Sequence, residues 1–332
     1  MKCFLGWMGI ALVSMVALGC AEQPQMSDDG EGASEETRQA LRLVNGKQMN
    51  GTQVNGSYLN GIKQNGIKQN GIKQNGIKQN GIKQNGTSLE GVREDTGAVV
   101  EGMEFEGAEM EGVLGDDQPV VLHIADISDT EVPGMYTYLV TTPDGESICG
   151  RDAQNLPIRA MPLPGLWDYD TGAHIADPEH LTFACRGAAL AKCMEMGYSR
   201  FGTWNDGSTV VQNGDFHDAC VRLLRADYCG NGASHTQDGT LVDVFDKKGT
   251  QTETPNSGLQ FEAEWGPDGA TCIRRTRWAT TGAGDVATYL SAPENAVSCG
   301  GRFVPNDTTC GTTWRAGGLI RNATGLNDHS SF

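Results

Sequence analysis

From just after Leu41, the chain is organised in steps of five residues, most of which end in glycine. Related units fill residues 42–61, and five identical copies of Ile-Lys-Gln-Asn-Gly fill residues 62–86. Further units, one of them six residues long, continue to Gly112. A fixed period sustained over this length is typical of stacked, repetitive architectures rather than of an ordinary globular core. The period therefore predicts a separate repeat array over residues 42–115.

Many units share a second pattern within the five-residue period. The middle residue is often apolar, and a small residue often lies two places before it, as with Thr87 and Leu89. The apolar middle residues are Val44, Met49, Val54, Leu59, Leu89, Val100, Phe105 and Met110. This pattern resembles that of pentapeptide-repeat proteins, and the resemblance implies a right-handed, four-sided β-helix in which both positions point inward.

The five identical copies depart from that family pattern. Their middle position is glutamine, from Gln64 to Gln84, where the family has an apolar residue. A buried amide must find hydrogen-bond partners, and a Gly-Asn-rich stretch can equally remain an unfolded spacer. Two alternatives therefore stay open for this N-terminal part: a pentapeptide-like β-helix or a flexible repeat stalk.

The first residues have the layout of a bacterial export signal. Lys2 precedes an apolar stretch from Phe4 to Leu18, which is too short to predict a membrane-spanning helix. The stretch ends in Ala17-Leu18-Gly19-Cys20, which resembles the lipobox of bacterial lipoproteins. The resemblance implies that residues 1–19 are removed as a signal peptide and that Cys20 carries lipid; the alternative is ordinary signal cleavage with an incidental thiol. We therefore expect a protein anchored in the bacterial cell envelope, at the outer membrane, with the membrane as a partner.

Composition narrows the classes of function. Residues 20–41 are acidic and polar, which predicts a solvated tether. The whole chain holds 42 acidic and 25 basic residues, a formal charge of −17. Because binding to nucleic acid needs a positive surface, the charge argues against a nucleic-acid partner.

Residues 116–332 hold an even number of cysteines. Export leads to an oxidising compartment, so these cysteines predict four disulfides, with the connectivity open. No Cys-x-x-Cys spacing occurs among them, which disfavours a zinc site. The eight residues are Cys149, Cys185, Cys193, Cys220, Cys229, Cys272, Cys299 and Cys310.

Local patterns in residues 116–332 predict an α+β, disulfide-rich domain with mostly antiparallel strands and two short helices. Runs of β-forming residues predict strands over Val120–Ile124 and Met135–Val140. The alternation over Phe261–Trp265 predicts a further strand with one buried face.

Helix signals occur between these strands. The first predicted helix covers Arg186–Met196 and stops at Gly197. The second begins with Asp215 as its cap and is ended by Gly230 in a left-handed conformation. On its outer face, Asp218 and Arg222 are four residues apart, a spacing that favours an ion pair.

The second helix leads into a distinctive motif. The sequence Ala226-Asp227-Tyr228-Cys229 resembles the signature for which the ADYC-domain family is named. Flanking residues fit as well: Gly197-Tyr198, His217 and His235–Thr240. The resemblance implies an exported or lipid-anchored bacterial protein, with the family domain covering much of residues 140–330. The family has no assigned activity, so the resemblance implies no catalytic residue.

Four residues in or near this motif supply ligand and acid–base chemistry: His217, Asp227, His235 and Asp238. Histidine together with carboxylates can hold a divalent metal or transfer protons. The alternative is structural: Asp227 accepts hydrogen bonds at the helix end, Tyr228 is core, and Asp238-Gly239 makes a turn. We favour the structural alternative. No Gly-x-Ser-x-Gly elbow is present, which disfavours a serine hydrolase.

Arg274, Arg275 and Arg277 form a basic cluster in an acidic chain. Strand alternation would place Arg275 and Arg277 on one face. The cluster could dock the acidic side of the repeats or an anionic envelope polymer, or it could be a solvated strand whose arginines make surface ion pairs. We favour the solvated strand.

These observations lead to two hypotheses of function. In the first, the chain is a non-enzymatic envelope lipoprotein, and residues 116–332 are a structural or binding module that contacts an envelope polymer or a surface protein, without a cofactor. In the second, it is a secreted, metal-assisted, hydrolase-like enzyme that uses His235 and Asp238 with Asp227 or His217. The first is favoured, because no catalytic signature is present.

Overall fold

The structure, a computed structural model, describes residues 98–114, 119–132, 134–168, 171–177, 180–236, 239–277, 299 and 308–325. Before residue 98 it describes residues 43–44, 53–54, 57–63, 68–69, 83–85 and 87–92. All of these belong to the compact unit Gln39–Phe332. No helix within these ranges is both long and apolar enough to cross a membrane.

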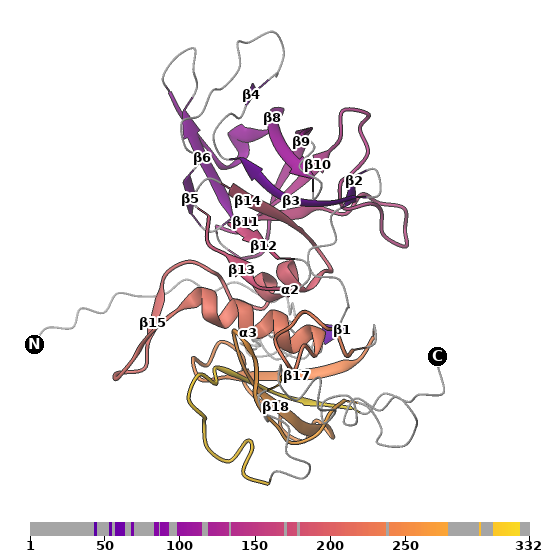
Figure 1. Ribbon diagram of the computed structural model, residues 1–332. Coiled ribbons are helices and arrows are strands. Elements are labelled where there is room, and N and C mark those ends of the chain that lie inside the picture. The colour runs from indigo at the N-terminus through magenta and orange to yellow at the C-terminus, as the bar shows by residue number, and fades with distance from the viewer. Residues whose placement is uncertain are drawn as a thin grey trace, which may run out of the picture. The chain divides into compact units, whose positions relative to one another are not determined.

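A large antiparallel sheet forms the first part of this unit (Figure 1). Among the described residues its strand order is β2-β3-β14-β11-β10-β9-β8-β4, and β3 also pairs with β8. The strands from β3 to β8 in this order therefore close into a ring, which we call the strand ring. Its strands are β3 (Ser57–Lys63), β14 (His180–Cys185), β11 (Ala160–Pro164), β10 (Tyr136–Thr141), β9 (Pro119–Asp129) and β8 (Ala108–Leu114), flanked by β2 (Gln53–Val54) and β4 (Lys68–Gln69).

The strand ring has its own apolar core. Leu122, Ile124 and Val140 are buried there, together with Tyr138 and Phe183, whose ring centroids are 6.0 Å apart. The hydroxyl of Tyr138 donates to the backbone oxygen of Thr87 at 2.9 Å. A residue of the repeat array is thus bonded directly to the centre of this core.

The last units of the repeat array contribute side chains to the same core. Four of their apolar middle residues are buried in it: Leu89, Val100, Phe105 and Met110. They lie on β6 (Ser88–Val92), β7 (Val99–Glu101), the 3-10 helix η1 (Gly102–Phe105) and β8. β5 (Lys83–Asn85), β6 and β7 pair antiparallel, whereas coils of a β-helix stack parallel strands. Most of the identical copies, residues 70–82, lie outside the described residues.

A second antiparallel sheet is formed mainly by the later part of the chain. Its order in the described residues is β1 (Leu43–Val44), β17 (Leu241–Asp246), β20 (Ile320–Thr324), β18 (Gln260–Gly266) and β19 (Gly269–Ile273). Helix α3 (Asn213–Arg225) packs against β18, β19 and β20, and also against α2 (Ala189–Glu195). Two short hairpins complete the set: β12 (Leu166–Trp167) with β13 (His174–Ile175), and β15 (Thr203–Asn205) with β16 (Val210–Gln212).

Both predicted helices are present, with different ends. α2 is shorter than predicted, and Gly197, where it was predicted to stop, follows it in a left-handed conformation, at φ 89°. α3 begins two residues before Asp215, which lies in its first turn, so the prediction of Asp215 as the cap was wrong. The prediction that Gly230 ends the helix was also wrong, because Ala226 is the left-handed residue at the C-cap, at φ 51°.

The prediction of four disulfides is confirmed by the pairs Cys149–Cys185, Cys193–Cys220, Cys229–Cys299 and Cys272–Cys310. Cys193–Cys220 joins α2 to α3, with a Cα separation of 5.9 Å. Each bond closes a loop of the unfolded chain and so lowers its entropy. The described C-terminal part is therefore an α+β, disulfide-rich fold with mostly antiparallel strands, as predicted.

Candidate functional site

The residues of the Ala-Asp-Tyr-Cys motif follow directly on the end of α3. All four are buried, at 5% exposure or less. Ala226 ends the helix in the left-handed conformation, and its N–H bonds to the carbonyls of Arg222 and Leu223. Gly230 follows at φ +68°, and a Cβ there would lie 2.1 Å from the backbone oxygen of Asp268. Only glycine satisfies both the conformation and the close approach at this position.

Asp227 organises the loop after the helix. Its carboxylate pairs with Arg222 and accepts the backbone N–H groups of Asn231 at 3.1 Å and Gly232 at 2.9 Å. The side chain of Arg222 also donates to the carbonyl of Pro267 at 3.1 Å. The structural interpretation of Asp227 is therefore confirmed: its carboxylate oxygens hold the motif loop in place.

Tyr228 lies at the centre of a buried polar group. Its hydroxyl donates to Oε1 of Glu262 at 2.5 Å and accepts the backbone N–H of Arg277 at 3.1 Å. Its ring stacks on Trp265, with 5.3 Å between centroids. Burial, and then the charge of Glu262, raise the pKa of Tyr228 well above its ordinary value, so the hydroxyl keeps its proton. Tyr228 is core, as predicted.

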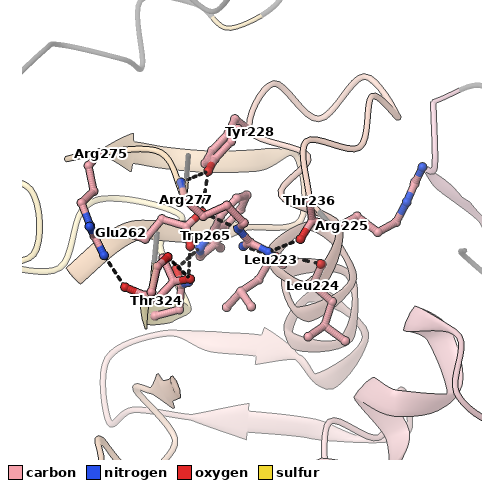
Figure 2. Close-up of polar contacts among 12 residues, drawn as sticks. Leu223, Leu224, Arg225, Tyr228, Thr236, Glu262, Trp265, Arg275, Arg277 and Thr324 are labelled. Atoms are coloured by element: carbon pink, nitrogen blue, oxygen red, sulfur yellow. Dashed lines mark hydrogen bonds and ion pairs between the residues drawn. The ribbon is translucent and has the colours of Figure 1, made fainter. Parts of the chain in front are cut away.

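Arg277 and Glu262 form an ion pair with no solvent exposure on either side chain. Nε of Arg277 is 3.0 Å from Oε1 of Glu262, and the remaining guanidinium donors reach the carbonyls of Leu223 and Leu224 and the hydroxyl of Thr236 (Figure 2). The last carbonyls of a helix lack partners within the helix, so Arg277 caps the C-terminal end of α3. Burial alone would lower the pKa of Arg277, but Glu262 and Tyr228 raise it above its ordinary value.

The second oxygen of Glu262 extends this group into the sheet. Oε2 accepts from Nδ2 of Asn322 at 2.6 Å, and Oδ1 of Asn322 accepts from Nε1 of Trp265 at 2.8 Å. Tyr228, Glu262, Arg277 and Asn322 are thus connected by hydrogen bonds. Buried charged groups need such partners to offset the loss of water. We call these four residues and Trp265 the motif network.

A β-bulge places Glu262 in the interior. In the pairing of β18 with β20, Phe261 is opposite Ala323 and Ala263 is opposite Asn322, so Glu262 is the extra residue. A bulge re-aims side chains and breaks the two-residue alternation of a strand. The predicted single buried face of this strand was therefore wrong, since Glu262, Ala263, Glu264 and Trp265 are all buried.

The favoured interpretation of the arginine run as a solvated strand also proved wrong for Arg277. Only Arg274 of the three is exposed. Arg277 is fully buried in the motif network, and Arg275 donates to the carbonyls of Gln260 and Thr324. The regular strand β19 ends at Ile273, before the run begins, so strand alternation does not apply to it.

His217 is fully buried and lies in a separate cluster between α2 and α3. Its Nε2 donates to the carbonyl of Leu190 at 3.0 Å, and its Nδ1 accepts from Arg200 at 3.2 Å. Burial is the main cause that lowers the pKa of His217. Burial would raise the pKa of Asp218, but its neighbours His217 and Arg200 lower it to about 2. Asp218 thus pairs with Arg200, and Arg222 pairs with Asp227, so the predicted Asp218–Arg222 pair was wrong.

The predicted site residues do not come together as one group. His217 and Asp227 are ten positions apart along α3 and its end, roughly 15 Å at the rise of a helix. His235 does lie beside the motif, with its ring stacked 6.0 Å from that of Tyr228, and burial lowers its pKa. Asp238 lies outside the described residues. Within the described ranges, no three His, Cys, Asp or Glu residues are grouped so that they could hold a metal ion.

Residues 102–279 match the family model of the ADYC domain. The chain belongs to the ADYC domain family. The match begins earlier and ends earlier than the extent of residues 140–330 predicted from the motif. No curated protein and no solved structure matches the chain.

A second buried ion pair joins Glu264, on the same strand as Glu262, to Arg321 of β20. Glu264 accepts from Nε of Arg321 at 2.9 Å and from the backbone N–H of Arg315 at 2.7 Å. The guanidinium of Arg321 lies 3.9 Å from the ring centroid of Trp314. A Cβ on Gly318 would lie 1.9 Å from the carboxylate of Glu264, so only glycine leaves room for the buried carboxylate in this position.

Sequence reasoning did not identify Glu262, Asn322 or Arg277 as members of the motif network. Glu262 and Arg277 resemble ordinary surface charges in their local patterns. Two general rules were available: a buried tyrosine needs a partner for its hydroxyl, and buried charges occur in pairs. Neither rule identifies which distant residue supplies the partner.

We expect Glu262→Gln to lower the free energy of unfolding by about 3–5 kcal/mol, because it leaves the buried Arg277 charge without its partner. Glu253 is exposed, so Glu253→Gln is a matched control that should change stability by less than about 0.5 kcal/mol. Urea denaturation of the oxidised chain measures both. Equal stabilities of the two variants would show that the ADYC domain does not depend on this ion pair.

The stability of the protein should also depend on the protonation of His217. Since the pKa of His217 is lowered from 6.5 in the folded state, acidification protonates this imidazole mainly in the unfolded chain. Stability therefore falls as the pH falls below the unfolded pKa. We expect His217→Gln to reduce the slope of unfolding free energy against pH between pH 7 and 5, by up to about 1.4 kcal/mol per pH unit. Parallel pH profiles of the variant and the native chain would contradict this assignment.

Proposed function

We propose that this ADYC-domain protein is a non-catalytic lipoprotein of the bacterial cell envelope. Cys20 carries the lipid at the outer membrane, and the acidic tether and the repeats display a structural or binding module. Its partner is an envelope polymer or a surface protein. The observation that carries this proposal is that the polar side chains of the motif itself bond within the fold.

The chemistry of the motif supports a structural role. A general acid or base must reach the proton that it transfers. The carboxylate of Asp227 is fully buried and accepts from Arg222, Asn231 and Gly232. The hydroxyl of Tyr228 is bonded on both sides within the motif network. A metal-assisted hydrolase built on Asp227, His235 and Asp238 would have to break the bonds of Asp227 before this carboxylate could bind metal or substrate.

The disulfides support the lipid anchor indirectly. All eight cysteines after residue 116 are paired with one another. None of these eight cysteines therefore needs Cys20 as a disulfide partner. The lipobox-like sequence before Cys20 favours lipidation of its thiol instead. Two or three acyl chains on one residue bind a bilayer stably, whereas one chain does so only marginally.

The proposal predicts that the protein binds no stoichiometric metal. Elemental analysis of the oxidised full chain, after dialysis against zinc, manganese or iron, should find far less than one ion per chain. His235→Ala should leave that value unchanged and alter stability alone. One equivalent of metal, lost on His235→Ala, would contradict the proposal and favour the metal-assisted enzyme.

The anchor has its own test. In bacterial cells fed an alkyne-labelled fatty acid, the native chain should incorporate label and sediment with the membranes. Cys20→Ser should abolish labelling and release the protein, because no acyl chain can attach. Cys3 precedes the predicted cleavage site, so Cys3→Ser is the matched control and should leave both readouts unchanged. Label on the Cys20→Ser chain would contradict lipidation at this position.

A further inference from the structure

The strand ring is closed by a strand that comes from the repeat array. β3 pairs with β14 on one side and with β8 on the other. The remaining strands of the ring pair with one another between β14 and β8, through β11, β10 and β9. Without β3, the facing side of β14 and that of β8 from Gly112 to Leu114 would be unpaired edges, and unpaired edges readily bind an added strand. We call the space between these edges the closing slot.

Of the β3 residues that pair in the closing slot, Ile62 and Lys63 belong to the first identical repeat copy, whereas Leu59, opposite Leu114, belongs to the unit before it. Ile62 is opposite Leu181 of β14 and Gly112 of β8, and Lys63 is opposite His180. Pairing of this kind is made by backbone groups, so it selects an extended segment of suitable pattern rather than one unique sequence. The same Asn-Gly-Ile-Lys sequence recurs at 60–63, 65–68, 70–73, 75–78 and 80–83.

The second copy shows that the edge of β8 accepts another repeat unit. In β4, Lys68 is opposite Glu109 and Gln69 is opposite Ala108. Opposite charges in directly facing positions stabilise an antiparallel pair. Each identical copy carries one lysine and no acid, whereas β8 carries Glu109 and Glu111. The copies are thus a basic segment of an acidic chain, and the edge that they meet is acidic.

We propose that the closing slot of one chain accepts a repeat copy from a second chain, so that the protein assembles by exchange of identical strands. Each chain has one closing slot and five copies that fit it. Replacing its own copy by an equivalent copy from a neighbour breaks and forms the same backbone pairs. Over the Asn-Gly-Ile-Lys sequence, exchange therefore costs no backbone-pairing energy, and the register is not fixed by sequence differences between the copies.

Concentration decides which copy occupies the slot. The chain's own β3 is tethered nearby and has a high effective concentration, so a dilute chain closes its own ring. At high concentration, copies from neighbouring chains compete with it, and the array then links one chain to the next. This inference does not depend on the lipid anchor, because strand exchange can take place between chains in solution.

The first experiment measures mass against concentration with the full chain carrying Cys20→Ser, by light scattering after size exclusion. We expect single chains when dilute and assemblies when concentrated. Replacing Ile67, Ile72, Ile77 and Ile82 by proline removes backbone donors from the later copies but leaves β3 intact. This variant should associate at least about tenfold more weakly, whereas valine at the same positions should preserve assembly.

The second experiment locates the contact. A chain with Lys73→Cys, the third-copy equivalent of Lys63, is mixed with a chain with His180→Cys and oxidised. Facing residues of an antiparallel pair are roughly 4.5–5.5 Å apart at Cα, within the range of a disulfide. We expect a linked pair of unlike chains. Gln74→Cys is the control and should link poorly, because in an exchanged strand neighbouring side chains would lie on opposite faces.

Three results would overturn the proposal: a single-chain mass at every concentration, assembly unchanged by the prolines, or no linked pair with Lys73→Cys. A circular dichroism spectrum and thermal transition like those of the native chain would establish that the proline variant is folded. Because the Cys20→Ser chain carries no lipid, these results are separate from the tests of anchoring and of metal binding.

Discussion

The ADYC domain depends on a charge that has no access to water. The guanidinium of Arg277 is bonded to Glu262, Thr236 and the last carbonyls of α3, and the backbone N–H of Arg277 is bonded to Tyr228. Moving such a charge out of water costs several kcal/mol, which only a full set of partners offsets. The helix end, the bulged strand β18 and the motif must therefore be in place together. This mutual dependence explains why a tyrosine follows directly on the end of a helix: its hydroxyl completes the ion pair.

Such a buried pair adds specificity more readily than stability. An apolar replacement of similar volume is often as stable as a buried ion pair, so the motif network need not be the main source of folding energy. That energy comes from the apolar contacts of α3 with the second sheet and of the strand ring with its own core. The network instead fixes the position of α3 over β18, because a shift would leave Glu262 or Arg277 unpaired. The four disulfides act on the unfolded chain and restrict the alternatives further.

Sequence patterns predicted the parts of this fold that local chemistry decides. Even cysteine number and export predicted the disulfides, helical periodicity predicted α2 and α3, and the position of Asp227 at a helix end predicted its bonds to backbone N–H groups. The failures share one cause, which is that the partner is distant in the chain. Asp218 has Arg222 at helical spacing but pairs with Arg200 from the preceding loop. In a regular strand Glu262 would be exposed, and a bulge, set by pairing with β20, turns it inward.

The boundaries of the folded unit follow from the same non-local pairing. The family match covers residues 102–279, yet the strand ring is closed by β3 before it, and the second sheet contains β20 after it, which supplies Asn322 to the motif network. Leu89 and Val100 of the late repeats are buried in the core of the ring. A fragment cut at residue 116 would remove strand β8 and these side chains, and would leave the edges of β9 and β14 unpaired. The repeats therefore take part in the fold itself. A repeated sequence can supply the closing strand, because backbone pairing requires only an extended segment with suitable alternation of side chains.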